Sequence, residues 1–508
     1  MFAACTGGIL IFRKLYLRLH LAIIVNTADN QRNRRYPLPF AGLTILFFMW
    51  GFITVMNDVL INSFGELFNL KPTELSYIQL TFFGGFFVVS LLYFIVSAST
   101  GRDPINRLGY KNGMSISLLV CGLGCGLAYL ASLNTSYPQF IMSLFVLSVG
   151  VTLLQICANP YATILGPQET ASSRLNLAQG FNSLGTTLGP IVGSILIFSV
   201  FSDGVKTIAS VGLTYLIYGA VFTIMAFLVW FSKFPAFVNE ESLQDEGSIL
   251  KHRHLIFGII AIFFYVGSEV SLGSWIGSFA QEEEIMGMDD KAANYFLAYF
   301  WGGLMIGRLT ASISLNNSLK KSRKYLYMLV MALSVFVVLW IVTGVKIDTK
   351  NAELSVQFSP LHFKQLWIYL CFIIINFLAF IWGKGNAARL IVIFSSINIV
   401  LLSIGILGKG ELAFWAILGT GLFLSIGWSN IFSLSIRNLG KMTSQGSSLL
   451  VMAIVGGAAL PWIQSNIIEE FDVQTSFIIP LLGMIYLVFF GLYGYKSKPE
   501  RKEALDSP

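Results

Sequence analysis

Charged residues are scarce in this 508-residue chain. Asp, Glu, Lys and Arg together make up 12% of it, against roughly 25% in an ordinary globular domain. Hydrophobic residues make up 55%, and the mean hydropathy is +0.72. This composition excludes a soluble protein of several domains and indicates a polytopic membrane protein.

Several motifs of soluble enzymes are also missing. There is no G-x-x-x-x-G-K-[ST] phosphate loop, which argues against ATP as an energy source, and no H-E-x-x-H zinc motif. The four histidines lie outside the expected membrane spans, and the five cysteines form no C-x-x-C pair and are interpreted as packing residues. We expect no enzymatic activity, no cofactor and no bound metal.

The chain contains many long apolar runs. They do not alternate as the strands of a membrane barrel would, so they favour helices of about 20 residues. Fourteen spans are expected, at residues 39–62, 76–99, 113–133, 140–164, 176–200, 208–231, 255–280, 293–314, 325–345, 366–383, 390–407, 412–436, 446–467 and 474–495. The predicted fold class is therefore all-α.

Lysine and arginine are distributed unevenly between the loops. One side carries most of them, including Arg102, Arg107 and Lys320, whereas the other side carries an acidic stretch at 282–290. Basic loops tend to stay in the cytoplasm, so both termini are expected there. The net charge of +7 has the same origin, and no nucleic acid partner is expected.

Short matches indicate that the chain contains two similar halves. The motif at 82–85 (FFGG) recurs at 300–303 (FWGG), and Pro190 has a counterpart at Pro461. The second match has the larger offset along the chain, and the increase is about the length of two helices with their loops. We expect two six-helix bundles plus an inserted helix pair at about 324–384.

The expected domain boundaries follow from this repeat. They are an N-terminal extension at 1–36, an N-terminal six-helix bundle at 37–232, a cytoplasmic linker at 233–253, a C-terminal bundle with the inserted pair at 254–496, and a cytoplasmic tail at 497–508. Residues 1–30 mix basic and apolar residues in an order unlike a signal peptide, and we interpret them as a peripheral amphipathic or disordered extension, with a misassigned start as the alternative.

Two carboxylates lie well inside apolar spans, Asp58 in the first and Glu269 in the seventh. Burial disfavours the charged form of an acid, which raises its affinity for a proton or makes it a sodium site. The two spans are equivalent in the repeat, so both acids would flank the same central space. The alternative for each is a structural acid bonded to a neighbouring helix. Arg308, near a cytoplasmic helix end, is expected to snorkel to the surface and to serve packing or a loop contact.

Four amide side chains fall inside the fourth and fifth spans. Gln155 and Asn159 are four residues apart, and Gln179 and Asn182 three apart, so each pair shares a helix face. Amides offer the paired donors and acceptors that sugar hydroxyls need, although they also join helices. Pro160 is expected to break the fourth helix.

Other residues near these positions have less specific expectations. Gly185, Gly189 and Gly193 form a stripe of small residues that lets helices approach closely. Trp275 and Trp428 fall near the expected site, where a flat ring can stack on a sugar, although packing is the commoner role.

The stretch from Leu153 to Gly189, LLQICANPYATILGPQETASSRLNLAQGFNSLGTTLG, resembles the fucose permease and glucose/galactose transporter family of the major facilitator superfamily. Residues 47–58, 265–275, 293–296, 306–308 and 438–457 extend the resemblance, which runs from about residue 37 to the end apart from the inserted pair. It implies two bundles that rock about a central sugar site, driven by a cation gradient.

The resemblance also implies roles for individual residues. Proton coupling falls on Asp58, and sugar contacts fall on Gln179 and Asn182. Gln155 stands where fucose permeases have a glutamate, so together with Glu269 it looks more like the glucose/galactose branch. Residues 429–430 depart from the family, because relatives often have proline and threonine there.

We therefore predict a secondary active transporter that imports a monosaccharide, either a hexose such as glucose or galactose or else fucose, by symport with a proton coupled at Asp58. The predicted substrate contacts are Asn57, Gln155, Asn159, Gln179, Asn182, Glu269, Trp275 and Asn430. We expect a monomer in the lipid bilayer. The alternatives are coupling to sodium, a non-transporting membrane sugar receptor, a membrane-embedded glycosyl-transfer enzyme, and an exporter of drugs or lipids.

Overall fold

The computed structural model describes residues 37–68, 70, 72–202, 207–235, 248–288, 290–350, 353–361 and 363–496. The extension at 1–36, the tail at 497–508 and residues 236–247 of the linker lie outside the described residues. Apolar helices fill nearly all of the rest, as the charge-free runs predict.

In the described part of the first half, the chain forms six long helices. They are α2 (Pro37–Leu67), α3 (Pro72–Thr100), α5 (Tyr110–Leu133), α6 (Tyr137–Ile164), α7 (Ala171–Ile195), which continues as a π-helical turn at Leu196–Val200, and α8 (Ile208–Phe231). The short α4 (Pro104–Leu108) lies between α3 and α5, and its first turn is capped by Asp103.

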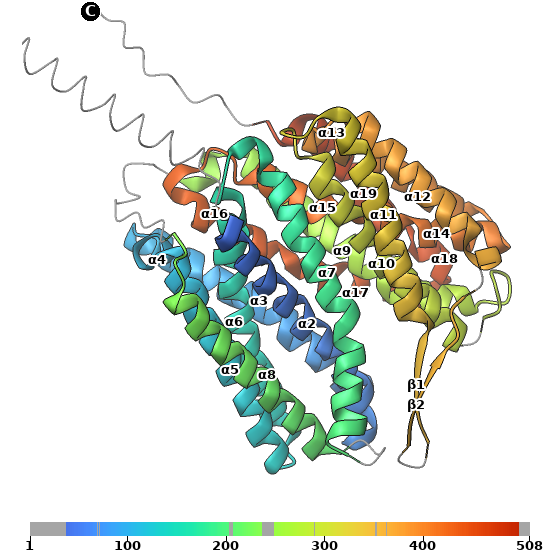
Figure 1. The fold of residues 1–508 in the computed structure, drawn as a ribbon, viewed down its shortest axis with the longest axis horizontal. Helices are drawn as coiled ribbons and strands as arrows, with labels where there is room; N and C mark the ends of the chain where they lie inside the picture. Colours follow the sequence, from blue (N-terminus) through green and yellow to red (C-terminus); the bar gives the residue numbers. More distant parts are fainter. Residues whose placement is uncertain are drawn as a thin grey trace, which may run out of the picture.

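The second half contains more elements. Its helices are α9 (Arg253–Gln281), α10 (Asp290–Ser314), α11 (Lys321–Gly344), α12 (Phe363–Gly383), α13 (Ala387–Leu407), α14 (Gly410–Leu424), α15 (Gly427–Ser435), α16 (Thr443–Met452), α17 (Gly456–Glu470), α18 (Val473–Ser476) and α19 (Ile478–Phe489). Strands β1 (Val345–Lys350) and β2 (Glu353–Phe358) form an antiparallel hairpin between α11 and α12. Figure 1 shows this hairpin projecting away from the end where α4 and α16 lie.

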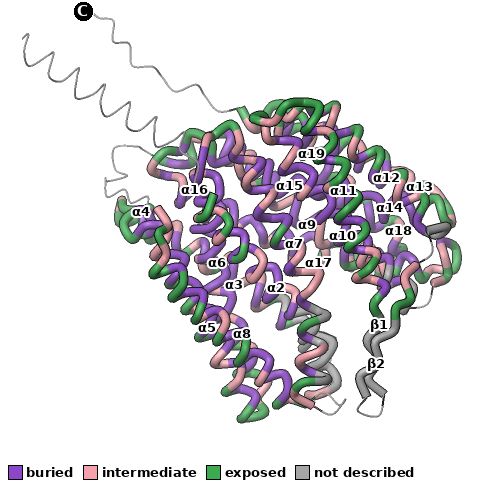
Figure 2. The backbone as a smooth tube through the Cα atoms, viewed as in Figure 1, coloured by how far each residue is buried: buried purple, intermediate pink, exposed green. Residues whose placement is uncertain are grey.

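The helices are those of a multi-pass membrane protein. Among the described residues, 13 helical segments are long and apolar enough to cross a bilayer. The remaining long helix, α7, is not among these segments; it carries Asn176, Gln179 and Asn182. With α7 the segments match the fourteen expected spans, and the all-α fold class is confirmed. Figure 2 shows buried residues where helices face one another and exposed residues on the outer sides.

The packing of the helices repeats between the two halves. In the first, α5 packs against α6 and α8, α2 against α7, and α3 against α6; in the second, α13 packs against α14 and α19, α9 against α17, and α10 against α14. These equivalences leave α11 and α12 without counterparts. The pair packs against α10, α13 and α14, outside the repeated arrangement (Figure 1).

One backbone contact recurs in both halves. A Cβ at Gly185 would lie 2.1 Å from the carbonyl oxygen of Phe48, and a Cβ at Gly456 would lie 2.1 Å from that of Phe263. The offset between the two glycines along the chain equals the offset between Pro190 and Pro461. Each glycine therefore lets the fifth helix of its half lie directly on the first helix.

The expectation that Gly185, Gly189 and Gly193 serve close packing is confirmed. All three face α2: a Cβ at Gly189 would lie 2.5 Å from a side-chain carbon of Val55, and a Cβ at Gly193 would lie 2.6 Å from the sulfur of Met56.

Helix interruptions differ from those expected. Pro160 does not break α6, which continues to Ile164, so that expectation is wrong. The spans expected at 412–436 and 446–467 are each interrupted instead, at residues 425–426 and 453–455. Both breaks lie in the second half, and the first of them leaves the backbone carbonyl of Ser425 free to accept a side-chain hydrogen bond.

Candidate functional site

The two bundles meet mainly at one end of the molecule. This end, called here the basic end, carries residues 101–109, 165–170 and 436–442, which link consecutive helices. There the hydroxyls of Tyr110 and Ser444 lie 2.8 Å apart, and the Asn106 amide donates to the carbonyl of Lys441. The first bundle thus contacts the start of α16 directly.

A second row of contacts joins α7 to the other bundle. The hydroxyls of Ser172 and Ser433 lie 2.6 Å apart, and the Asn176 amide donates to the Asn430 side chain at 2.9 Å. Asn430, a predicted sugar contact, therefore takes part in joining the bundles, and its role toward a substrate stays a prediction.

The deepest of these contacts is made by Arg308 of α10. Its guanidinium pairs with Glu269 of α9 at 3.1 Å and donates to the hydroxyl of Ser183 on α7 at 2.7 Å. Its Nε donates to the carbonyl of Ser425, at the break between α14 and α15, at 3.2 Å. Ser183 lies about 18 Å along α7 from its start, at 1.5 Å per residue. One buried arginine therefore ties four helical segments together near the middle of the bundle.

The expectation that Arg308 snorkels to the surface is wrong. Its side chain is 9% exposed, because the carboxylate of Glu269 offers a partner within the bundle. Sequence reasoning found Glu269 but missed this partner, although Arg308 lies inside the span expected at 293–314 and is the strongest available counter-charge for a buried acid. A glycine at 307 is also needed, since a Cβ there would lie 1.9 Å from the Ser425 hydroxyl.

The four predicted amides are buried on α6 and α7. The Asn159 amide donates to the backbone carbonyl of Gln155 at 3.1 Å, and the Gln179 amide donates to the Asn159 side chain at 3.5 Å. Asn182 donates instead to the carbonyl of Phe47 on α2, at 3.1 Å. The structure thus brings the side chains of Asn159 and Gln179 together, with Gln155 one turn before Asn159 on α6 and Asn182 one turn after Gln179 on α7.

Gln155 is unusual within this group. It is fully buried, and neither polar atom of its side chain has a hydrogen-bond partner among the described residues. A buried amide without partners is costly, so such a group is explained best by a ligand, a water or an ion that satisfies it.

The remaining predicted residues are less well placed. Asn57 and Asp58 belong to α2, but their side chains lie outside the described residues. Trp275 is half-buried, with an indole N–H that has no partner among the described residues. The ring of Trp428 stacks on that of Phe432, with centroids 5.8 Å apart, which agrees with packing.

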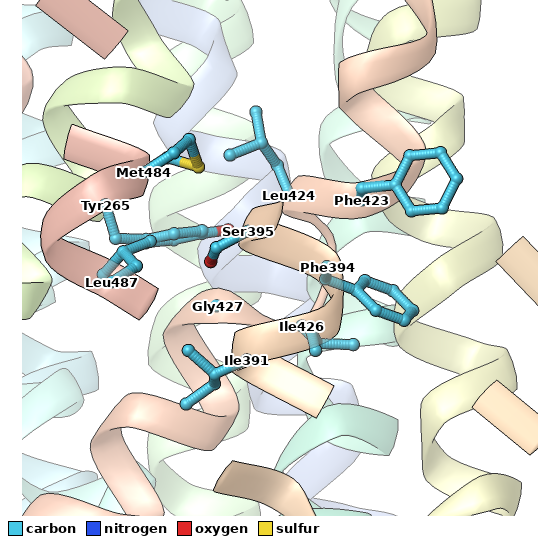
Figure 3. Close-up of a pocket in the computed structure, with 10 residues that line it drawn as sticks. All are labelled: Tyr265, Ile391, Phe394, Ser395, Phe423, Leu424, Ile426, Gly427, Met484 and Leu487. Carbon is cyan, nitrogen blue, oxygen red and sulfur yellow. The ribbon is translucent and has the colours of Figure 1, made fainter. Parts of the chain in front are cut away.

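An internal void lies in the second bundle but cannot hold a sugar. Figure 3 shows it between Tyr265, Ser395, Gly427 and Met484, from α9, α13, α15 and α19. Its volume is about 10 Å³, close to the room that a single water needs. In the described part of the chain, no group of three or more His, Cys, Asp or Glu side chains is arranged to hold a metal.

Two helical bundles with polar and ionised side chains buried between them define a membrane transporter. A family model for the Major Facilitator Superfamily matches residues 38–395, and the chain belongs to this superfamily.

Similar proteins indicate the branch of the superfamily to which the chain is related. A glucose/galactose transporter of Brucella abortus is 36% identical over 474 residues, covering 92% of this chain and 97% of the relative. An L-fucose-proton symporter of Escherichia coli is 26% identical over 491 residues, covering 92% and 95%. These names confirm the resemblance to the fucose permease and glucose/galactose transporter family, and all of them describe transporters rather than enzymes.

Solved structures agree with the fold. The crystal structure of the Escherichia coli fucose:proton symporter FucP superposes with a TM-score of 0.69 at 25% identity, covering 92% of this chain and all of that one. A second FucP structure, in the outward conformation, has a TM-score of 0.68.

Proposed function

We propose that this protein imports a monosaccharide, a hexose such as glucose or galactose or else fucose, by symport with a proton. The relatives named as glucose/galactose transporter and L-fucose-proton symporter, which match nearly the whole chain, support this assignment. The coupling residue would be Asp58 on α2, since a membrane-embedded carboxylate can hold the transported proton.

The observation that carries the proposal is the orphaned amide of Gln155 beside Asn159 and Gln179. A sugar presents several hydroxyls, each both donor and acceptor, and amides match that pattern. A hydroxyl can satisfy a fully buried amide that has no partner among the described residues. The sugar would lie between this group and Glu269, with Asn57, Asn182, Trp275 and Asn430 as further candidate contacts.

The sidedness follows from the basic end. Basic loops face the cytoplasm, so we assign residues 101–109, 165–170 and 436–442 to that side, with both termini. The contacts of Tyr110, Asn176 and Arg308 then lie in the cytoplasmic half and hold the bundles together there. The structure would accordingly be closed toward the cytoplasm and ready to receive sugar from outside a bacterial inner membrane.

Sugar-induced pH change in lightly buffered, energy-depleted cells tests the proposal. Glucose, galactose, fucose, mannose and N-acetylglucosamine would be added in turn to wild type and to Asp58→Asn. We expect alkalinisation with at least one sugar, absent in Asp58→Asn, which should still exchange labelled sugar because exchange needs no net proton movement. Glu470→Gln, an exposed acid at the opposite end, is the matched control and should behave as wild type.

The alternatives give different results. A sodium-coupled symporter would show sodium-dependent uptake without alkalinisation. A non-transporting receptor would bind sugar in purified form and accumulate none in cells. If the wild-type protein neither takes up nor binds any of the sugars, the proposal is wrong.

A further inference from the structure

The Glu269–Arg308 pair balances charge at the place where the substrate is proposed to bind. The pair lies between α9 and α10, and Arg308 also holds Ser183, the residue that follows Asn182 on α7. Ser183 in turn donates to the carbonyl of Gln179 at 3.1 Å. The ion pair is therefore joined through Ser183 to the part of α7 that carries Gln179 and Asn182.

The carboxylate of Glu269 is accessible as well as paired. Its side chain keeps 13% exposure, and the described bond to Arg308 uses only one of its two oxygens. Arg308 uses three of the five N–H donors of a guanidinium in its bonds to Glu269, Ser183 and Ser425. A ligand at this place would meet both a negative and a positive group in a site that excludes most water.

The formal charges of these two groups cancel. A neutral ligand entering there meets dipoles and hydrogen-bonding groups without a net charge, whereas an ionised ligand would leave an uncompensated charge in a poorly solvated site. Neutralising either member of the pair would create a net charge of known sign. Selectivity is the difference between the affinities for a neutral and for an ionised ligand, and the charge balance of the pair lowers the affinity for the ionised one.

We propose that the Glu269–Arg308 pair makes the transporter selective for uncharged sugars, and that Arg308, released from Glu269, recognises a sugar carboxylate. This inference rests on the proposed sugar-transport function. It assigns Arg308 as a specificity-determining residue, and it names hexuronates as the substrate class that the intact pair rejects.

The experiment compares three sugars of similar shape and different charge in exchange assays. Purified protein in liposomes, preloaded with unlabelled galactose, takes up labelled galactose in competition with galactose, galacturonate or galactosamine. The proteins are wild type, Glu269→Gln, Arg308→Gln and the double variant Glu269→Gln/Arg308→Gln. The net charge at the pair is zero in wild type and in the double variant, positive in Glu269→Gln and negative in Arg308→Gln. The assay needs no proton gradient, so it separates selectivity from coupling.

We expect the ratio of galacturonate to galactose inhibition to rise at least about tenfold in Glu269→Gln and to return toward wild type in the double variant. Arg308→Gln should shift toward galactosamine. An unchanged ratio in Glu269→Gln overturns the inference. So does an equal rise in the double variant, because the cause would then be loss of the glutamate and not the net charge.

A second route covers the case in which Glu269→Gln does not fold. Ser183→Asp keeps Glu269 and Arg308 and adds a carboxylate that can accept from the Arg308 guanidinium, as the Ser183 hydroxyl does, so it should raise preference for galactosamine over galactose. A preference equal to wild type in that variant also overturns the inference. If wild type binds none of the sugars scanned, in exchange or in direct binding, the proposed function fails, a result distinct from either outcome above.

Discussion

The two bundles share a backbone arrangement but differ in the chemistry they bury. The close approach of Gly185 to the Phe48 carbonyl in the first half repeats in that of Gly456 to the Phe263 carbonyl in the second, and a Cβ on either glycine would lie 2.1 Å from the carbonyl oxygen. At the corresponding polar positions, however, the first half has neutral side chains. The offset from Phe48 to Phe263 pairs Thr54 with Glu269, and the offset from FFGG to FWGG pairs Ser90 with Arg308.

The difference shows that the glycine positions at close helix contacts are the same in both halves, whereas the buried polar side chains differ. Close helix contacts require glycine at a fixed place, because backbone atoms leave no room for a Cβ. Buried polar side chains need only a partner, and the partner can be an amide in one half and an ion pair in the other. Among the described side chains of α6 and α7, the first bundle therefore offers a neutral, partly unsatisfied amide group, whereas α9 and α10 of the second offer a charge-balanced pair.

The largest effect should come from breaking the ion pair. Arg308→Met leaves the buried carboxylate of Glu269 without its counter-charge and should lower stability by about 3–5 kcal/mol. Ser90→Ala, at the equivalent position, should change stability by less than about 1 kcal/mol. Thermal unfolding of detergent-purified protein measures both. Adding Glu269→Gln to Arg308→Met should recover most of the loss; failure to recover would show that the arginine acts through packing alone.

An intermediate effect should come from the repeated glycines. Gly185→Ala and Gly456→Ala each place a Cβ against a backbone carbonyl, which overpacks the helix contact and should cost about 1–3 kcal/mol. Gly126→Ala on α5, where a Cβ meets no atom within 4 Å, is the control and should be neutral or slightly stabilising. Clearly unequal losses for the two glycines, in the same unfolding assay, would contradict their equivalence.

The smallest effect concerns the loops at the basic end. Asp103, between α3 and α4, accepts hydrogen bonds from Tyr93 and from two backbone N–H groups, yet burial raises its pKa above the usual 3.8. A raised pKa means that the folded state holds this proton more tightly than the unfolded state. Stability from this group is therefore greatest at low pH and falls as pH rises through the raised value.

Melting temperatures measured from about pH 4 to about pH 7 check this sign. The wild type should lose stability with rising pH relative to Asp103→Asn, which cannot ionise. Lys320→Gln, in the corresponding loop of the second half, should leave the pH profile parallel to that of wild type. Parallel profiles for Asp103→Asn and wild type would instead show that Asp103 does not contribute.

Most of the fold could be predicted from the sequence because a bilayer requires long apolar helices. The spans at 208–231 and 390–407 agree with α8 and α13 to within a few residues. The breaks at 425–426 and 453–455 could not, since neither contains proline. A tertiary contact lies beside the first break, where a Cβ on Gly427 would lie 2.0 Å from the Tyr265 ring.

The residues of the candidate site could largely be predicted from the sequence, but their hydrogen-bond and ion-pair partners could not. The rarity of charge inside apolar spans pointed to Glu269, and helical spacing pointed to Gln155 with Asn159 and to Gln179 with Asn182. The partner of Glu269 was missed, because distance from a helix end says nothing about which neighbouring helix faces a side chain. The link between Asn176 and Asn430 joins residues 254 positions apart, which no local pattern reveals.

The inserted helices α11 and α12 have a consequence for engineering. Two added crossings return the chain to the side it left, so every later loop keeps its compartment. The hairpin between them begins and ends at one place, with Val345 opposite Phe358 and Lys350 opposite Glu353 along the ladder. A tag or an antibody epitope inserted between β1 and β2 would therefore start and finish at adjacent points. It would report the location of that end of the protein in living cells without altering the membrane helices.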